Sequence, residues 1–227
     1  MPVGYSMLNF LKVFVNPQAL VHEEREAAYQ QQVGHLKEVW NDDAYGLERL
    51  LRLFLCLAQF IFPLLLIRDI FGRFGAISRK LAVEFYNLLK LVLPLAILYS
   101  GLYRYHFIIA VVIYLLSETI LHILNFIFLE DVHAAVVSYR RSMLLLFLHY
   151  LEVALDFAVV YIGFDLLSEK LSAVSAIYFS MVLSTTVGFG DIHAKGTAGQ
   201  LVVITQLLVC VLFIILFINH FSQRTQK

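Results

Sequence analysis

The residues with the clearest chemical meaning form the stretch STTVGFGD, which covers residues 184–191. Gly188 and Gly190 stand two apart in it, and glycine accepts the positive φ angles that other residues resist. Alternate residues from Thr186 to Gly190 can therefore turn every carbonyl the same way, which forms a column of oxygens. Four such columns around an axis would replace the hydration shell of a dehydrated potassium ion, and the Thr186 hydroxyl would add one more ring at the inner end. The stretch predicts a cation site made mainly of backbone.

The segments on either side of this stretch have the lengths needed to hold it in a membrane. Residues 172–184 have the length and polarity of a short helix, and its C-terminal end, which carries a partial negative charge, points at the cation site. Residues 142–164 and 198–222 are apolar and long enough to span a bilayer core of about 30 Å. A glycine-rich turn between two transmembrane helices is the alternative interpretation, but it explains neither the threonine pair nor Asp191.

Thr186, Val187, Gly188, Phe189 and Gly190 resemble the potassium-channel signature TVGYG. The resemblance implies that K+ binds at Thr186, Val187, Gly188 and Phe189, with carbonyls from residues 186–190 lining the filter. Because one chain contributes one filter segment and four must surround an ion, a homotetramer with closed rotational symmetry is expected. The elements that the resemblance implies are an outer helix at 142–164, a pore helix at 172–184, a filter at 185–191 and an inner helix at 198–222.

The family pattern also implies residues that support the filter, and this sequence departs from that pattern at some of them. Asp191 stands where the family's aspartate hydrogen-bonds an aromatic donor on the pore helix, and the donor here would be the Tyr178 hydroxyl. Thr185 is expected to pack against a neighbouring subunit. Phe189 replaces the usual tyrosine, which removes one hydroxyl behind the filter. Val182 stands where some members have a glutamate, so no carboxylate pair with Asp191 is expected.

The inner helix contains the residues expected to control opening. Many family members have a hinge glycine where this chain has Cys210, and no glycine follows Gly199, so bending there is less easy. The apolar run from Ile214 to Ile218 predicts a hydrophobic constriction that gates by dewetting, with core packing between inner helices as the alternative. The chain ends five residues after Ser222, so we expect no cytoplasmic ligand-binding domain.

The composition indicates a membrane protein. Of the 227 residues, 60% are hydrophobic and 15% are charged, and a soluble domain is rarely so apolar. Apolar stretches at residues 50–67, 85–103 and 107–129 precede the outer helix and predict about three peripheral membrane helices. The third contains no Lys or Arg, whereas conventional voltage sensing needs several arginines. The expected fold class is therefore an all-α polytopic membrane protein that carries a potassium-channel pore and lacks a conventional voltage sensor.

The expected regions are an N-terminal interfacial or soluble helical segment at 1–47, peripheral membrane helices at 48–130, a cytoplasmic linker at 131–141 and the pore domain at 142–222. Arg140 and Arg141 place the start of the outer helix in the cytoplasm by the positive-inside tendency. If residues 50–67 then cross fully, the N-terminal segment lies outside, although it carries Lys and Arg and no secretion signal. Two interpretations stay open: an earlier apolar piece also crosses, or residues 50–67 form a re-entrant or interfacial element around Pro63.

Polar side chains recur at helical spacing inside the apolar stretches of the second half of the peripheral region and in the outer helix. A charge in a membrane is costly unless it is paired, so these groups should face one another and not lipid. One interpretation is a structural seam that fixes the peripheral helices to the pore, and the other is a pH-sensitive seam, because histidine titrates near neutrality. The residues of the seam are Lys90, Glu118, His122, His149, Glu152 and Asp156.

These expectations combine into a potassium-selective channel that carries K+ passively through a homotetrameric pore, as a multi-pass protein in the lipid bilayer of the cell membrane, either plasma or inner. No cofactor is expected apart from the permeant K+ ions, and the net charge of zero argues against a nucleic-acid partner. An enzyme is not expected, because no nucleophile and base pair, phosphate loop or metal-ligand cluster stands in a water-facing segment. The alternatives are a weakly selective cation channel and a non-conducting regulatory or sensor subunit.

Overall fold

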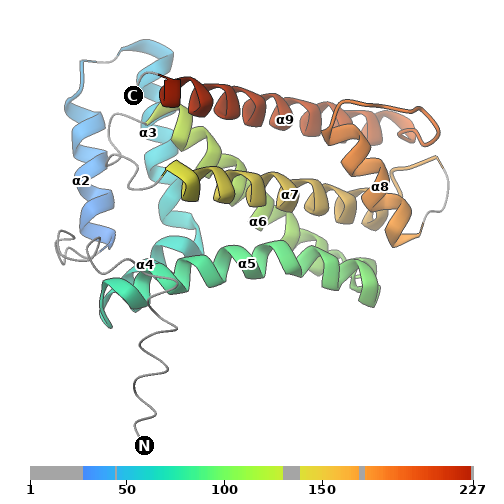
Figure 1. The fold of residues 1–227 in the computed structure, drawn as a ribbon, viewed down its shortest axis with the longest axis horizontal. Coiled ribbons are helices and arrows are strands. Elements are labelled where there is room, and N and C mark those ends of the chain that lie inside the picture. Colours follow the sequence, from blue (N-terminus) through green and yellow to red (C-terminus); the bar gives the residue numbers. More distant parts are fainter. Residues whose placement is uncertain (1–27, 44, 130–138, 169–171, 226–227) are drawn as a thin grey trace, which may run out of the picture. The chain divides into compact units, whose positions relative to one another are not determined.

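The computed structural model describes residues 28–43, 45–129, 139–168 and 172–225, which form α-helices and short 3-10 turns with no strand among them. Within these described ranges, four helical segments are each long and apolar enough to cross a membrane. The expected all-α polytopic fold is therefore confirmed. The chain forms two compact units, Met1–Tyr86 and Asn87–Lys227 (Figure 1). The four candidate spans are Ser78–Ser100, His106–Phe128, Arg141–Gly163 and Gly196–Asn219.

The first unit contains α2 (Ala28–Asn41), α3 (Gly46–Ala58), the 3-10 turn η2 (Gln59–Ile61) and α4 (Pro63–Gly72). α2 packs against both α3 and α4. The buried Gln32 side chain of α2 donates a hydrogen bond to the carbonyl of Cys56 in α3 at 3.0 Å. Arg52 of α3 forms an ion pair with Asp42 at 2.9 Å. Polar contacts thus fix α2 to α3.

The apolar stretch expected at residues 50–67 is divided between two helical segments. Gly46–Ile61 and Pro63–Gly72 are bent by 62° relative to each other. Phe62 between them is extended, with φ −94° and ψ 150°, because a residue before proline is pushed out of the helical region. Pro63 then fits at the first helical position, where no amide hydrogen is needed. This geometry is that of a broken span or a re-entrant segment. The bend lies at Pro63, where the interpretation of residues 50–67 as a re-entrant or interfacial element expected it.

The central helix of the second unit is α7 (Tyr139–Gly163), which packs against α6 (His106–Phe128), α8 (Ala173–Ser184) and α9 (Gly196–Thr225). In its apolar window 56% of the residues are buried inside the chain, against 28% to 33% in the other three candidate spans. Figure 1 shows α8 lying across one end of α7 and α9. α7 therefore connects the peripheral helices with the elements expected to form the pore.

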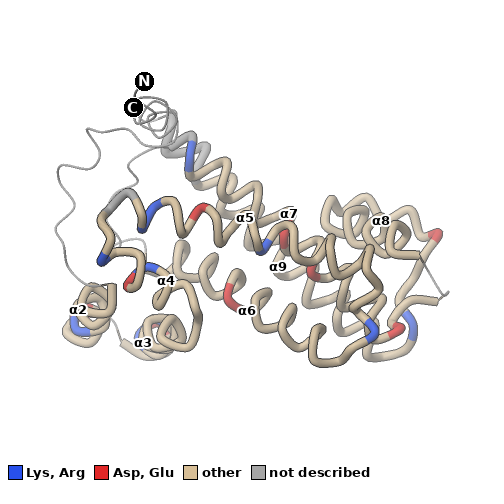
Figure 2. The backbone as a smooth tube through the Cα atoms, turned by 90° about the horizontal axis from the view of Figure 1, so that it is seen from below, with Lys and Arg blue, Asp and Glu red and all other residues tan. Residues whose placement is uncertain are grey.

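The remaining peripheral helix, α5 (Ala76–Ser100), contains residues of both units. It is joined to α6 by Gly101 and the 3-10 turn η3 (Leu102–Arg104), which form a tight hairpin. Charged residues are rare on the helices that follow (Figure 2). α6 carries one, Glu118, and α9 carries none before Arg224. The few charges inside these helices therefore need partners from within the chain.

The chain leaves α7 and returns to α9 through a narrow connection that we call the neck. Leu167 and Ala194 form an isolated antiparallel bridge, and the amide of Lys195 donates to the carbonyl of Leu166 at 2.7 Å. Gly199 in the first turn of α9 packs on the same carbonyl, because a Cβ added there would come within 2.7 Å of it. The neck therefore holds the start of α9 against the end of α7.

Candidate functional site

The loop that follows α8 has the alternating backbone conformation that its glycines predict. Thr186, Gly188 and Gly190 have positive φ angles of 57°, 58° and 77°. Glycine adopts such angles freely, whereas a β-branched residue there is a true outlier that costs on the order of 1–3 kcal/mol. The amide of Thr186 donates to the carbonyl of Leu183 at 3.0 Å, so the last turn of α8 holds the strained residue in place.

The side chains of this loop are exposed on the single chain. Residues 185–191 are all exposed, and the exposed fractions of Val187 and Phe189 are 55% and 68%. Both are large apolar side chains, which are more often covered than exposed in a folded protein. The Thr185 hydroxyl donates to the carbonyl of Met181 in its own helix at 3.0 Å. The contact of Thr185 with a neighbouring subunit stays a prediction.

Tyr178 and Asp191 lie together behind the loop, at the positions that the sequence predicts for the filter support. The Tyr178 hydroxyl donates a hydrogen bond to the Asp191 carboxylate, and this bond raises the pKa of Tyr178. The Tyr178 ring also stacks parallel to Phe189, with centroids 6.5 Å apart. A cavity of about 30 Å³ separates the loop from α8 and is lined by these three residues and by Val182.

A buried network of uncharged polar groups joins α7, α8 and α9. Its centre is Gln206 of α9, which has an exposed fraction of 0%. The Gln206 Oε1 atom accepts a hydrogen bond from the Tyr161 hydroxyl at 2.8 Å. The Nε2 atom lies 2.9 Å from Ser180 Oγ and 2.8 Å from Ser184 Oγ, and it donates to the carbonyl of Ser180 at 3.0 Å. We call Tyr161, Ser180, Ser184 and Gln206 the neutral cluster.

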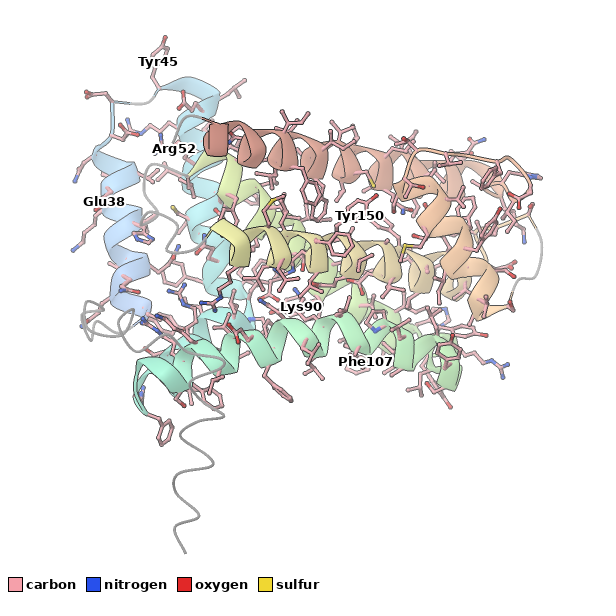
Figure 3. All side chains as sticks on the ribbon, in the orientation of Figure 1. Glu38, Tyr45, Arg52, Lys90, Phe107 and Tyr150 are labelled. Atoms are coloured by element: carbon pink, nitrogen blue, oxygen red, sulfur yellow. The ribbon has the colours of Figure 1, made fainter. Side chains whose placement is uncertain are left out.

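Tyr150 of α7 holds the end of α8 through a separate contact. Its hydroxyl donates to the carbonyl of Ser184 at 2.6 Å. Its ring packs edge-on against Phe213 of α9, with centroids 5.3 Å apart, and Figure 3 shows Tyr150 between α7 and α9. Ser184 is therefore held by α7 through its carbonyl and by α9 through its hydroxyl.

A second buried network contains charged groups and joins α5, α6 and α7. Lys90 Nζ of α5 lies 3.2 Å from Glu118 Oε2 of α6 and 3.1 Å from Glu152 Oε1 of α7. Thr119 of α6 accepts a hydrogen bond from Lys90 and donates one to Glu152 at 2.7 Å. His149 Nδ1 lies 2.9 Å from Glu152 Oε2. We call Lys90, Glu118, Thr119, His149 and Glu152 the ionic cluster.

The charged atoms of the ionic cluster are shielded from the surface of the chain. The side-chain exposed fractions are 4% for Lys90, 5% for Glu118 and 1% for Glu152. Figure 3 shows Lys90 lying between α5 and α7. A buried ammonium is tolerated only with close counter-charges, and both carboxylates supply them. The structure thus brings together four of the predicted seam residues, with Thr119 bridging Lys90 and Glu152.

The other two predicted seam residues lie beside the ionic cluster. Asp156 follows Glu152 by one turn of α7 and is buried, but its Oδ2 atom makes no hydrogen bond within the described part of the chain. His122 of α6 lies edge-on to His149, with ring centroids 5.7 Å apart. Asp156 and His122 therefore lie next to residues of the ionic cluster, Asp156 one turn from Glu152 and His122 against the ring of His149.

The residues predicted to control opening differ in their exposure on the single chain. Cys210 is buried and lies near the side chain of Ser184 at the end of α8. Ile214 and Ile218 have exposed fractions of 45% and 64%. α9 continues as one helix through all three positions. Cys210 therefore belongs to the packing of α9 on α8, and a constriction at Ile214 and Ile218 stays a prediction.

Reasoning from the sequence missed Gln206, Thr119 and Tyr150. A signal for Gln206 was present, because a polar amide inside an apolar spanning stretch is by default a candidate functional group. Thr119 and Tyr150 gave no such signal, because hydroxyl side chains are tolerated in membrane helices wherever they find a neighbouring acceptor. Their partners become visible only when the helices are packed.

The fold defines the class of the protein: a polytopic helical membrane protein with a loop of alternating positive φ angles between two candidate spanning helices. Residues 148–227 match the family model described as ion channel, so this part of the chain is similar to that family. The matched segment includes most of α7 and all of α8, the loop and the described part of α9. This similarity is consistent with a protein of the potassium channel superfamily. Comparisons with curated proteins and with solved structures found no match.

Proposed function

We propose that four copies of this chain form a potassium-selective channel, with residues 186–190 of each copy arranged around a common axis. The observation that carries the proposal is the alternation of positive φ angles at Thr186, Gly188 and Gly190. Left-handed and right-handed residues in turn direct successive carbonyls to one side, and rings of such carbonyls replace the hydration shell of K+. The ion would bind at the carbonyls of Thr186, Val187, Gly188 and Phe189.

The exposure of the loop supports assembly into a tetramer. One chain supplies one column of carbonyls, so a closed ring needs further copies related by rotation. Val187 and Phe189 are apolar and exposed on the single chain, and neighbouring copies would cover them. α8 ends at Ser184, directly before the loop, so the partial negative charge of its C-terminus favours a cation there.

The proposed channel conducts passively and has no conventional voltage sensor. α6 contains neither Lys nor Arg, and each elementary charge that crosses the field contributes about 2.3 kcal/mol per 100 mV. Ile214 and Ile218, exposed on α9, are the proposed hydrophobic constriction. The protein would lie in the cell membrane as a multi-pass protein, with lipid against its exposed apolar faces.

Purified protein in liposomes tests the proposal. With K+ on one side and Na+ on the other, we expect a reversal potential that favours K+ strongly, and a particle mass of four chains. Gly188→Ala should abolish this selectivity, because a Cβ there meets no atom within 4 Å and the substitution changes only the ease of holding φ at 58°. Gly34→Ala in α2 is the matched control, since that glycine also has open space and no positive φ.

Each alternative function gives a different result in the same experiment. Comparable K+ and Na+ currents would identify a weakly selective cation channel. A tetramer that passes no ions at any pH or voltage would identify a non-conducting regulatory or sensor subunit. A protein that remains monomeric in detergent and in liposomes would contradict the proposed pore, because no ring of carbonyls can then form.

A further inference from the structure

The buried side chain of Gln206 makes several hydrogen bonds, although packing alone would need none. Its amide carries one acceptor oxygen and two N–H donors. The oxygen accepts from Tyr161, and the nitrogen reaches three oxygens of Ser180 and Ser184 within 3.0 Å. An apolar side chain of similar length would fill the same space without needing any partner. The amide therefore connects three helices through specific bonds as well as filling a gap between them.

The partners of Gln206 lie on the turn of α8 that leads into the filter loop. Ser184 is the last residue of α8. The amide of Thr186 donates a hydrogen bond to the carbonyl of Leu183 in the same turn. Ser180, one turn earlier, also donates its hydroxyl proton to the carbonyl of Ala154 in α7. The position of this turn is thus fixed by α7 and α9 together.

We propose that Gln206 is a positioning residue for ion selection: by holding Ser180 and Ser184, it sets where the Thr186 ring stands relative to the pore axis. The inference rests on the proposed potassium pore. A carbonyl ring distinguishes K+ from Na+ only when its oxygens keep their number and placement, so a loosened turn admits both ions more equally. Gln206 itself does not touch the ion, since it is fully buried among α7, α8 and α9.

The test compares Gln206→Met with wild type in liposomes. The methionine keeps the length of the side chain and removes all of its hydrogen bonds to Tyr161, Ser180 and Ser184. We expect the permeability ratio of K+ to Na+ to fall about tenfold, which corresponds to about 1.4 kcal/mol. Gln200→Met, an exposed glutamine on the same helix, is the matched control and should keep the wild-type ratio.

Single-contact variants keep the inference testable if Gln206→Met does not assemble. Tyr161→Phe removes the bond to Oε1, and Ser184→Ala removes one bond to Nε2. Each should lower the ratio by less than Gln206→Met, and the double variant Gln206→Met with Ser184→Ala should lower it no further than Gln206→Met alone, because both remove one shared interaction.

The outcomes separate the inference from the proposed function. A wild-type tetramer that selects K+, together with assembled Gln206→Met or Ser184→Ala tetramers that select it equally well, overturns the role of Gln206 and leaves the potassium pore intact. A purely structural role would lower the thermal midpoint of the tetramer without moving the ratio. A wild type that does not select K+ overturns the proposed function, and this inference with it.

Discussion

α7 contributes to two buried polar clusters, and the cost of burying their polar atoms is offset in different ways. The neutral cluster joins α7 to α8 and α9 by hydrogen bonds among hydroxyls, an amide and backbone carbonyls. The ionic cluster joins α7 to α5 and α6 around one ammonium between two carboxylates. The first can lose one partner and remain uncharged. The second cannot lose its cation without leaving like charges together in a medium of low dielectric constant.

The difference indicates a division of tasks along one helix. Neutral hydrogen bonds are directional and insensitive to protons near neutrality, which suits the side of α7 that positions the filter loop. A charged group with a histidine partner responds to protons, which suits a side that senses or only anchors. The two clusters stand close in sequence, since His149 belongs to the ionic cluster and Tyr150, the next residue, holds Ser184.

The largest effect is expected from Lys90→Met. Removing the ammonium leaves Glu118 and Glu152 buried without their cation, so the free energy of unfolding should fall by about 3–5 kcal/mol. Thermal and denaturant unfolding of the protein in detergent measure it. Lys37→Met on the exposed face of α2 is the control and should have little effect. If Lys90→Met were no more harmful than the control, the ionic cluster would not be a charged unit.

A triple variant sharpens the same contrast. Lys90→Met combined with Glu118→Gln and Glu152→Gln removes the charges and keeps most of the volume. Neutral replacements of buried ion pairs are often harmless, so the triple variant should recover most of the stability that the single variant loses. Equal stability of the single and triple variants would show that packing, and not charge, determines the loss.

In the neutral cluster, Tyr161→Phe should cost less. The change leaves Gln206 Oε1 buried without a donor, which costs about 1–3 kcal/mol. Unfolding in detergent again measures it, with Tyr99→Phe at the exposed end of α5 as control. The loss should be the same at pH 6 and at pH 8, because no group of the neutral cluster titrates between them. A loss that varied with pH would break the distinction between the two clusters.

Protons should act through the ionic cluster. His149 contacts Glu152 of its own helix and His122 of α6, and Glu152 is in turn paired with Lys90 of α5, which also pairs with Glu118. The pH-sensitive interpretation of the seam predicts that His149→Gln removes most of any pH dependence of the current, at a stability cost of about 1.5 kcal/mol, the lower end for a hydrogen bond to a charged group. Channel recordings in bilayers check this.

The pair Glu118→Gln and His122→Gln tests the α6 side of the same idea. This pair should weaken the pH dependence of the current, whereas Tyr161→Phe should keep it. An unchanged pH profile in both His149→Gln and the α6 pair would leave the ionic cluster with a structural role alone.

The smallest effect is expected from Tyr178→Phe. It removes the hydrogen bond to Asp191, but both groups are exposed on the single chain, so stability should hardly change. That bond raises the pKa of Tyr178, whose ordinary value is about 10, so the hydroxyl stays protonated at pH 5.5 to 8 and any effect on current should not depend on pH. A strong effect on selectivity would show that this contact contributes more to ion selection than the neutral cluster does.

Much of the pore region follows from local sequence signals. The spanning helices follow from apolar length, and the loop conformation follows from glycines at 188 and 190, because φ preference is a property of single residues. The grouping of Lys90, Glu118 and Glu152 could also be predicted, since a buried charge must find a counter-charge and few were available. These expectations rest on what each residue cannot tolerate.

The features that were missed depend on which faces the helices present to one another. Cys210 and Ile218 lie on one helix, yet the first is buried and the second exposed, and no periodicity in so apolar a stretch distinguishes them. Gln206 could be noticed as polar, but its partners come from residues 22 to 45 positions away. The division of residues 50–67 at Phe62 depends on whether Pro63 starts a helix or bends one, which local preference leaves open.

The neck has a mechanical consequence for the filter loop. The bridge between Leu167 and Ala194 joins the two ends of the segment that contains Thr186. This segment is therefore a closed loop and not a free connection between two helices. Joining the two ends of the segment costs conformational entropy, and the contacts of the neck offset that cost. Gly199 packs against the carbonyl of Leu166 at this base, and losing that contact would release the constraint on the segment.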